Sequence, residues 1–255
     1  MDIKKKVQKQ FSQSAGSYVK SEIHANGEDL HELIRLANVT KKDRVLDIAT
    51  GGGHVANGLA PLVKEVVALD LTERMLQKAE AFIRGNGYTN VSFIVGDAEK
   101  LPFPDEAFSV VTCRIAPHHF PNIEQFIAES IRVLQEKGTL LLIDNVAPEK
   151  EEWDVFYNTV EKKRDPSHYR AWKKTEWLKL IEEKEFQVKQ LIVFSKTFSF
   201  ESWFARMRMP ENDKEELEEY MLNASGDTKH HFQIQEENGR VTSFNGQSVL
   251  IVAKK

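Results

Sequence analysis

Residues Leu46–Ala56 read LDIATGGGHVA, and this stretch joins a strand pattern to a helix pattern through three glycines. An acidic residue ends the strand-like run, and an apolar helical pattern resumes after the glycines. Such a glycine turn lets the backbone approach a ligand closely, and it is typical of nucleotide-binding α/β folds. On its own the stretch leaves three ligands open: a dinucleotide, a mononucleotide phosphate, or a molecule without phosphate.

Short apolar runs of strand type alternate with helical patterns through the first 150 residues. Each run is rich in Val, Ile and Leu, which suits the centre of a parallel sheet covered on both faces. The alternation predicts an α/β fold with a doubly wound, mostly parallel sheet. The expected strands are Arg44–Ile48, Glu65–Leu69, Val91–Val95, Ser109–Cys113 and Thr139–Ile143, and the main helical patterns are Leu30–Ala37, Met75–Ile83 and Ile123–Leu134.

After Asp144 the pattern becomes mainly helical and richer in aromatic residues. Two late strand-like runs complete the sheet, with a helical insertion between them that covers part of the molecule. The helical stripes are Trp153–Val160 and Trp177–Ile181, the late strands are Leu191–Phe194 and Val249–Ala253, and the insertion is Phe200–Ser225.

The composition is that of an ordinary globular protein, with 41% hydrophobic and 29% charged residues among 255. A formal net charge of −4 argues against a nucleic-acid partner, because neutralising phosphates needs a basic surface. Cys113 is the only cysteine, so no intramolecular disulfide is possible and a reducing compartment is expected. No apolar run is long enough to span a bilayer, and the N-terminus does not resemble a secretory signal. We therefore expect a cytoplasmic protein without stable membrane insertion.

Acidic residues at three successive strand ends narrow the choice of ligand. Asp47, ahead of the glycines, would repel a pyrophosphate but attract a cationic amino group. Asp70 can accept hydrogen bonds from two ribose hydroxyls, although a glycine pattern followed by an acid at this distance also fits a nicotinamide cofactor. Asp97 could accept from an adenine amine, with Ala98 leaving room for the ring. Together the acids favour a positively charged nucleoside that lacks phosphate.

The stretch from about Arg44 to Asp144 resembles the class I S-adenosylmethionine-dependent methyltransferases, in particular the group similar to the ubiquinone/menaquinone-biosynthesis methyltransferases. The resemblance is carried, in this order, by VLDIATGGGHVA, VVALDLTERML, VGDAEKLPFPDEAFSVVTCRIAPHHF and VLQEKGTLLLID. The family's first motif is usually D-x-G-x-G-x-G, and Ala49 stands here at the first glycine. The resemblance implies a Rossmann-like sheet of seven strands whose last strand is antiparallel, and Val249–Ala253 is the candidate for it.

The resemblance further implies methyl transfer from S-adenosylmethionine to a small organic acceptor within a single domain. Residues 1–40 would form an N-terminal helical cover, 41–147 the cofactor-binding core, and 148–255 the acceptor-side helices and final strands. The implied cofactor-binding residues are Asp47, Ala49, Gly51 and Gly53 at the methionine end, Asp70 at the ribose, Leu71, Met75, Asp97 and Ala98 around the adenine, and Arg114 after the fourth strand.

The segment Arg114–Phe120, RIAPHHF, follows the fourth expected strand, where methyl donor and acceptor should meet. It lacks the Asn/Asp-Pro-Pro-aromatic motif that amine-modifying members of the family often carry there. His118 and His119 are candidates for a general base or for acceptor-binding groups, and packing or helix capping is the structural alternative. Adjacent histidines without a matched third ligand do not predict a metal site.

The acceptor pocket is expected beyond Asp144. The polar segment Lys163–Arg170, KRDPSHYR, could close over the site and direct Arg164, His168 and Arg170 at an acidic or carbonyl-bearing acceptor; its alternative is an exposed Asp-Pro turn. Tyr18 could cover a sulfonium through a cation–π contact, or pack in the core. His24 and Trp203 complete the expected pocket.

Two other functions stay open. An NAD(P)-dependent oxidoreductase shares the pattern Gly51, Gly53 and Ala56, but it leaves Asp47 and the Asp97-Ala98 pair unexplained. A non-catalytic protein could bind the same cofactor on the same fold. The identity of the acceptor, the atom that is methylated and the oligomeric state are not predicted by the sequence.

Overall fold

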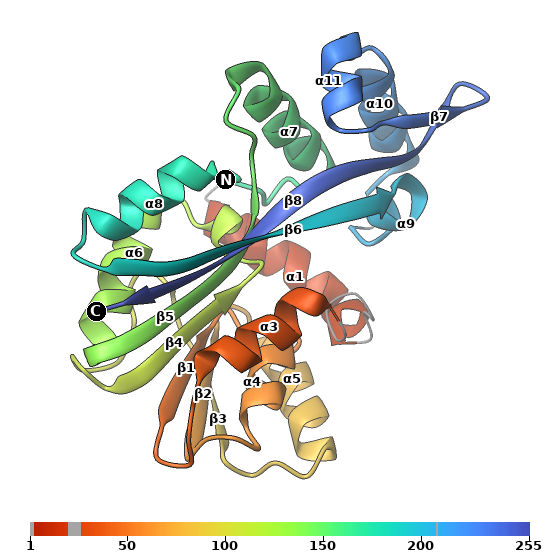
Figure 1. Cartoon of the computed structure of the whole chain (residues 1–255). Coiled ribbons are helices and arrows are strands. Elements are labelled where there is room, and N and C mark those ends of the chain that lie inside the picture. The colour runs from red at the N-terminus through yellow and green to blue at the C-terminus, as the bar shows by residue number, and fades with distance from the viewer. Residues whose placement is uncertain (1–2, 20–26, 208) are drawn as a thin grey trace.

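The computed structural model describes residues 3–19, 27–207 and 209–255, apart from the side chains of residues 13–19. A central sheet of eight strands organises this part of the chain (Figure 1). The strands are β1 Arg44–Ile48, β2 Glu65–Asp70, β3 Val91–Val95, β4 Phe108–Arg114, β5 Leu134–Val146, β6 Gln187–Ser199, β7 Gln235–Glu237 and β8 Arg240–Lys254.

The strand order is β3-β2-β1-β4-β5-β8-β6, and the first five strands are parallel. The last strand, β8, runs antiparallel between β5 and β6. This arrangement confirms the predicted doubly wound, mostly parallel sheet and its antiparallel last strand. The eighth strand is an addition: β7 is a three-residue partner of β8, and its exposed sequence Gln-Glu-Glu has no apolar period that would indicate a strand.

Helices cover both faces of the parallel part of the sheet. The helices are α1 Ile3–Val19, α3 Glu28–Ala37, α4 His54–Leu59, α5 Glu73–Gly85, α6 Ile123–Val133, α7 Glu151–Arg164, α8 Lys174–Glu182, α9 Phe200–Ala205, α10 Glu211–Leu222 and α11 Gly226–His231, with a 3-10 turn η1 at Pro117–His119. Successive strand residues point to opposite faces, so Val45 packs with α3 and α4 whereas Leu46 packs with α6 and α8. The sheet is therefore buried on both sides, as its continuous apolar strands require.

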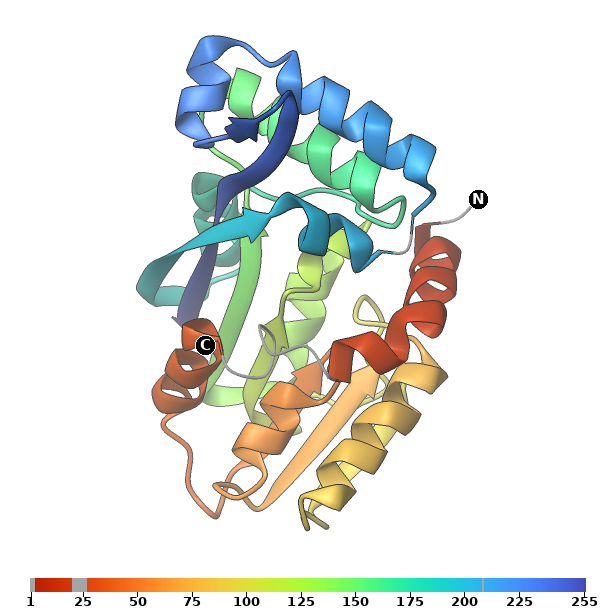
Figure 2. The same cartoon turned by 90° about the vertical axis from the view of Figure 1, so that its right-hand side faces the viewer.

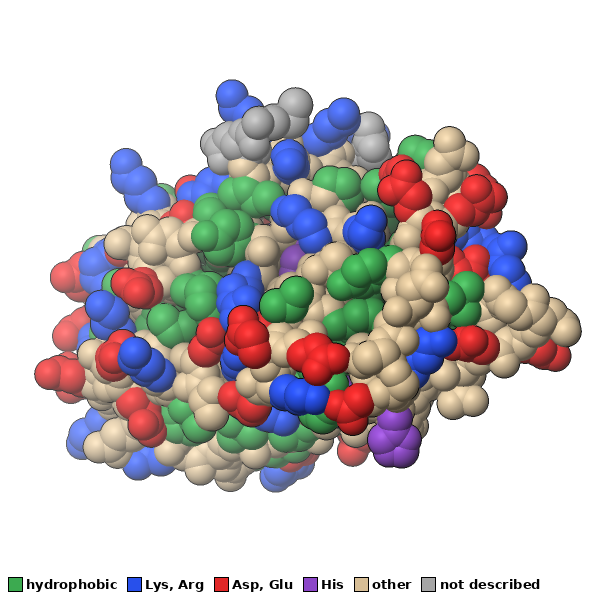
Figure 3. Space-filling model, turned by 90° about the horizontal axis from the view of Figure 1, so that it is seen from above, with side chains coloured by type: hydrophobic (Ala, Val, Ile, Leu, Met, Phe, Trp, Pro, Cys, Tyr) green, Lys and Arg blue, Asp and Glu red, His purple; other side chains and the backbone are tan. Residues whose placement is uncertain are grey.

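A third hydrophobic cluster lies beyond the carboxyl ends of the parallel strands. There α9 and α10 pack on the long ends of β6 and β8, and α7 and α11 complete the layer (Figures 1 and 2). The cluster buries Tyr157, Trp203 and Phe244. Seen from above, this end of the molecule carries both signs of charge interspersed with hydrophobic side chains (Figure 3). None of the described helices is both long and apolar enough to cross a membrane.

Candidate active site

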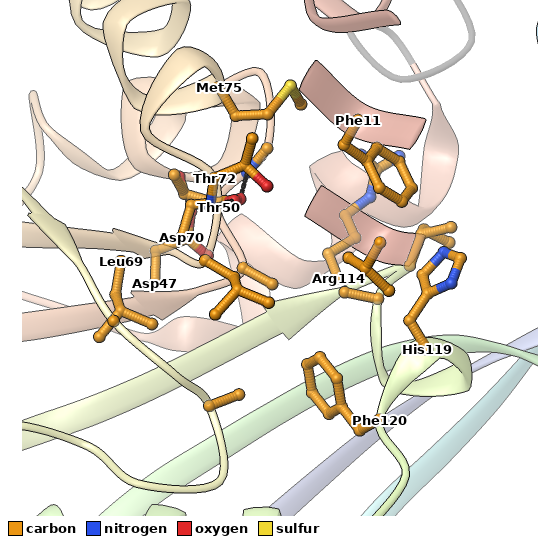
Figure 4. A pocket seen from close by; sticks show the side chains of 18 of the residues that line it. Phe11, Asp47, Thr50, Leu69, Asp70, Thr72, Met75, Arg114, His119 and Phe120 are labelled. Carbon is orange, nitrogen blue, oxygen red and sulfur yellow. Dashed lines mark hydrogen bonds between the residues drawn. The ribbon is translucent and has the colours of Figure 1, made fainter. Parts of the chain in front are cut away.

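A cavity opens where the carboxyl ends of β1, β2 and β4 meet, which is where the strand order reverses (Figure 4). We call it the first cavity. It brings together nearly all the residues that the sequence assigned to a cofactor. These are Asp47, Ala49, Gly51, Asp70, Leu71, Met75, Asp97, Ala98 and Arg114.

The glycine loop after β1 uses left-handed backbone conformations at several positions. The φ angles of Ala49, Gly51 and Gly53 are 52°, 55° and 83°. Gly51 lines the first cavity, but Gly53 does not, contrary to expectation. A Cβ atom at Gly53 would lie 2.9 Å from the Ile83 side chain of α5, so this glycine allows α4 and α5 to pack closely. Gly52, which the sequence reasoning did not assign, lines the cavity in its place.

Asp47 is a fully buried carboxylate at the floor of the first cavity, with 1% of its surface exposed. The hydroxyls of Thr50 and Thr112 donate to its two oxygens at 2.6 and 2.7 Å. Burial outweighs these hydrogen bonds and raises the pKa of Asp47 to about 6. Asp47 forms no ion pair within the described part of the chain. A cation placed in the cavity would therefore supply the countercharge that this carboxylate lacks.

Asp70, at the end of β2, braces the loop and also faces the cavity. Its two oxygens accept backbone hydrogen bonds from Gly51, at 3.0 Å, and from Thr72, at 2.8 Å. Burial raises its pKa to about 6. The hydrogen bond from the Thr72 N–H also places Asp70 beside the start of α5, where Thr72 is the N-cap residue. A carboxylate oxygen has a second lone pair, so both oxygens can still accept hydrogen bonds from a ligand.

Helix α1 lies beside α5 (Figure 2) and lines the first cavity with Lys4, Val7 and Phe11. The Lys4 ammonium lies 2.6 Å from an Asp97 oxygen and 2.5 Å from a Glu99 oxygen. The side chain of Phe11 meets the His119 ring edge-on, with ring centroids 5.1 Å apart. These contacts make α1 a wall of the cavity, and Lys4 is a site residue that sequence reasoning missed.

A second cavity of about 310 Å³ adjoins the first. The two share Phe11, Arg114, Ile115 and His119, so these side chains stand between them. Ile115 has a φ of 55°, which is rare and strained for a β-branched residue. Such strain is often held at functional sites. The junction of the two cavities is therefore the natural place for a group to pass from one ligand to another.

The two predicted histidines differ in their surroundings. His118 lines only the second cavity, and its Nδ1 lies 2.5 Å from an oxygen of buried Asp144. Burial lowers the pKa of His118, but the charge and hydrogen bond of Asp144 outweigh it and raise the pKa. The pKa of His119 is lowered to about 4 by burial and by its neighbour His118. His119 is therefore neutral at physiological pH, whereas His118 is the stronger base.

The residues expected around the acceptor are only partly brought together. Arg164 and Trp203 line the second cavity, where the guanidinium lies 4.4 Å from the ring centroid. His168 lines neither cavity and hydrogen-bonds Asn158 at 3.0 Å. Arg170 also lies outside both, contrary to expectation, because ion pairs with Asp154 and Glu176 hold it. Asp165 and Ser167 of the segment Lys163–Arg170 are buried, so the alternative of an exposed turn does not hold there. His24 and the Tyr18 side chain lie outside the described residues.

Comparison with known proteins identifies the family. The model of the methyltransferase domain matches residues 46–142, which span the glycine loop and the parallel strands. The chain is also 35% identical over 242 residues to the uncharacterized methyltransferase YcgJ of Bacillus subtilis (strain 168), covering 94% of this chain and 96% of that protein. This chain is a member of the methyltransferase family.

Solved structures and more distant relatives agree with this assignment. A protein assigned as a methyltransferase from Bacillus halodurans C-125 has 52% identity and a TM-score of 0.88, with coverage of 90% of this chain and 99% of that one. The ubiquinone/menaquinone biosynthesis C-methyltransferase UbiE of Ectopseudomonas mendocina is 37% identical over 119 residues, 45% of this chain and 46% of that protein. The resemblance that the strand-end motifs carried is thereby confirmed.

Sequence reasoning missed Asp144, Asp29 and Lys196 of this methyltransferase. Asp144 had a signal, since it is a fourth acid at or near the end of an expected strand, like Asp47, Asp70 and Asp97. Asp29 pairs with Arg114 at 3.0 Å in the wall of the second cavity, and no local pattern indicates that contact. In the described part of the methyltransferase, no group of three His, Cys, Asp or Glu side chains is arranged to hold a metal ion.

Proposed function

We propose that this methyltransferase uses S-adenosylmethionine to methylate a small organic acceptor. The observation that carries the proposal is the buried carboxylate of Asp47, which has no ion-pair partner among the described residues and a pKa raised to about 6. A buried charge of this kind is costly unless a ligand of opposite charge pairs with it. The amino group of the methionine moiety would supply that charge, whereas the pyrophosphate of a dinucleotide would repel it.

The other walls of the first cavity fit the remaining parts of the same molecule. Asp70 has acceptor capacity for a ribose diol, as a carboxylate with two oxygens does. Leu71, Met75 and Ala98 offer apolar surface for an adenine ring. Gly51 lines the cavity with backbone alone, and a Cβ there would come into contact with the Met75 side chain at 3.6 Å. The two cations of this lining, Lys4 and Arg114, pair with Asp97 and Asp29, whereas Asp47 and Asp70 form no ion pair with a described residue, which suits a cationic nucleoside.

When bound, S-adenosylmethionine supplies a methyl group that is already activated on a cationic sulfur. The chain itself has three tasks: to hold the acceptor in the second cavity, to align it through the junction at Phe11 and Ile115, and to exclude water. Alignment alone can lower a barrier by about 7–11 kcal/mol. Helix α1 contributes to exclusion, because Lys4 ties it to Asp97 across the first cavity. His118 and His119 are the candidate bases at the acceptor.

Calorimetric titration of the full chain with S-adenosylmethionine and, separately, with NADH tests the proposal. We expect heat of binding from the methyl donor and none from NADH. Binding of NADH without any response to S-adenosylmethionine would overturn the proposal in favour of an oxidoreductase. Donor consumption across a panel of hydroxyl, amine and carboxylate acceptors then separates an enzyme from a protein that binds the donor without turnover.

A further inference from the structure

His118 and Asp144 form a buried pair at the second cavity. Asp144 follows directly on the apolar centre of β5 and is fully buried. One of its oxygens lies 2.5 Å from His118 Nδ1, and its other oxygen has no hydrogen-bond partner. Because a carboxylate accepts, the bonded Nδ1 carries the proton, and in neutral His118 the free lone pair is on Nε2. Nε2 makes no hydrogen bond to any described residue, and the ring lines the second cavity.

The groups that face His118 from the neighbouring elements direct a proton to it rather than to His119. Asp144 on β5, Glu161 on α7 and Asp165 after α7 all favour its charged form, and His119 and His168 are the neighbouring rings. The pKa of His119 is lowered to about 4, and burial lowers the pKa of His168 as well. The two neighbouring imidazoles thus stay neutral at physiological pH. His118 is the ring in this cluster that can hold a proton there.

The wall of the second cavity is suited to a developing negative charge. Arg114, Lys196 and Arg206 line it, together with the aromatic side chains of Phe198 and Trp203. Burial lowers the pKa of Lys196, so this ammonium would gain from an anion nearby. Cationic groups in a buried site stabilise an oxyanion and oppose an ammonium ion.

The acids of the same wall are largely committed to protein partners. Asp29 pairs with Arg114 at 3.0 Å, and Glu161 pairs with Arg164 at 2.9 Å. An acceptor that starts neutral and becomes anionic therefore suits this cavity better than one that starts as a cation.

We propose that His118, positioned by Asp144, removes the proton of a weakly acidic hydroxyl group on the acceptor, so that methyl transfer is to oxygen. The O–H bond breaks, its electron pair stays on oxygen, and the proton binds to Nε2 of His118. The oxygen then bonds to the methyl carbon while the S–CH3 bond breaks, and that electron pair stays on sulfur to leave a neutral sulfide. The inference rests on the proposed function, because it requires the methyl donor in the first cavity.

The test uses 4-nitrophenol as the acceptor probe, because its phenolate absorbs visibly and its phenol form does not. The protein is saturated with S-adenosylhomocysteine at a pH where free 4-nitrophenol is mostly protonated. We expect the bound probe to show the phenolate band. In Asp144→Asn and His118→Gln the ratio of bound phenolate to bound phenol should fall at least about tenfold, which equals about 1.4 kcal/mol. Glu28→Gln is the control, since it removes an exposed carboxylate of the same cavity that neither bonds His118 nor is among the groups that favour its charged form.

Every outcome of this experiment either supports or overturns the inference. Absence of probe binding, a bound probe that stays protonated, or a phenolate band retained in both Asp144→Asn and His118→Gln would overturn the inference. Calorimetry with S-adenosylhomocysteine checks that each variant still folds and binds. Failure of the unaltered protein to bind this compound would refute the proposed function itself, whereas normal binding without ionisation of the probe refutes only the role of His118 and Asp144.

Discussion

The variant Asp47→Asn should stabilise the ligand-free protein and at the same time abolish tight binding of the methyl donor. The pKa of Asp47 is raised by burial from 3.8 to about 6 in the folded state. A carboxyl with a raised pKa favours the protonated form in the fold, so the free energy of unfolding falls as pH rises through this range. Above this pH range the ionised Asp47 lowers the free energy of unfolding by about 3 kcal/mol, at about 1.4 kcal/mol for each pH unit between the two pKa values. Below pH 3.8 the cost disappears.

Asparagine removes this cost and can keep the local hydrogen bonds. The partners of Asp47 are the hydroxyls of Thr50 and Thr112, which can donate to an amide oxygen or accept from an amide nitrogen. At neutral pH the variant should therefore unfold at a higher temperature, by about 6–12 °C at about 2–4 °C per kcal/mol. Binding of S-adenosylmethionine should weaken at least about 100-fold, because loss of one partner of a buried ion pair costs about 3–5 kcal/mol.

Asp70→Asn is the matched control for this prediction. Asp70 has the same raised pKa of about 6, but its partners are the backbone N–H groups of Gly51 and Thr72. These groups only donate, so the amide nitrogen of asparagine would oppose one of them, and the gain in stability should be lost. The measurement is calorimetric unfolding at neutral and acidic pH, with and without the donor. A melting temperature for Asp47→Asn at or below that of the unaltered protein at neutral pH would refute the reasoning.

Three further predictions concern the loop, the covering helix and the cysteine. Ala49→Gly should raise the free energy of unfolding by up to about 1 kcal/mol, because Ala49 has a left-handed φ of 52°, whereas Gly51→Ala at a φ of 55° should lower the free energy of unfolding. Denaturant unfolding measures both changes, and a lower free energy of unfolding in Ala49→Gly would contradict the argument. Lys4→Met should release S-adenosylhomocysteine severalfold faster in stopped-flow experiments, since it cuts the ties to Asp97 and Glu99. High salt should narrow that difference, and equal release rates would exclude the role of these ion pairs. Cys113 is fully buried and its thiol pKa is raised by burial, so a thiol reagent should label it only as fast as the protein unfolds; rapid labelling of the native protein would disprove this.

The strands of the parallel sheet and the glycine loop could be predicted from the sequence alone. Their signals are local, because runs such as Arg44–Ile48 and Glu65–Leu69 are apolar throughout and lie between helical periods. The meeting of the acids at the strand ends could also be predicted, since parallel strands bring their carboxyl ends to one edge of the sheet. The sheet topology alone therefore predicts that Asp47, Asp70 and Asp97 lie at one site, and all three line the first cavity.

The contacts that define the acceptor side depended on the tertiary structure. Lys4 reaches Asp97 across 93 positions of the chain, and His118 meets Asp144 across 26. No periodicity links such residues, because their separation in space is set by how α1 and η1 pack on the sheet. Arg170 shows the same limit, since its polar segment resembled a binding loop until packing placed Asp154 and Glu176 within reach. Local sequence thus determined the sheet and the donor cavity, whereas long-range packing decided which neighbouring histidine is the stronger base and which arginine faces the second cavity.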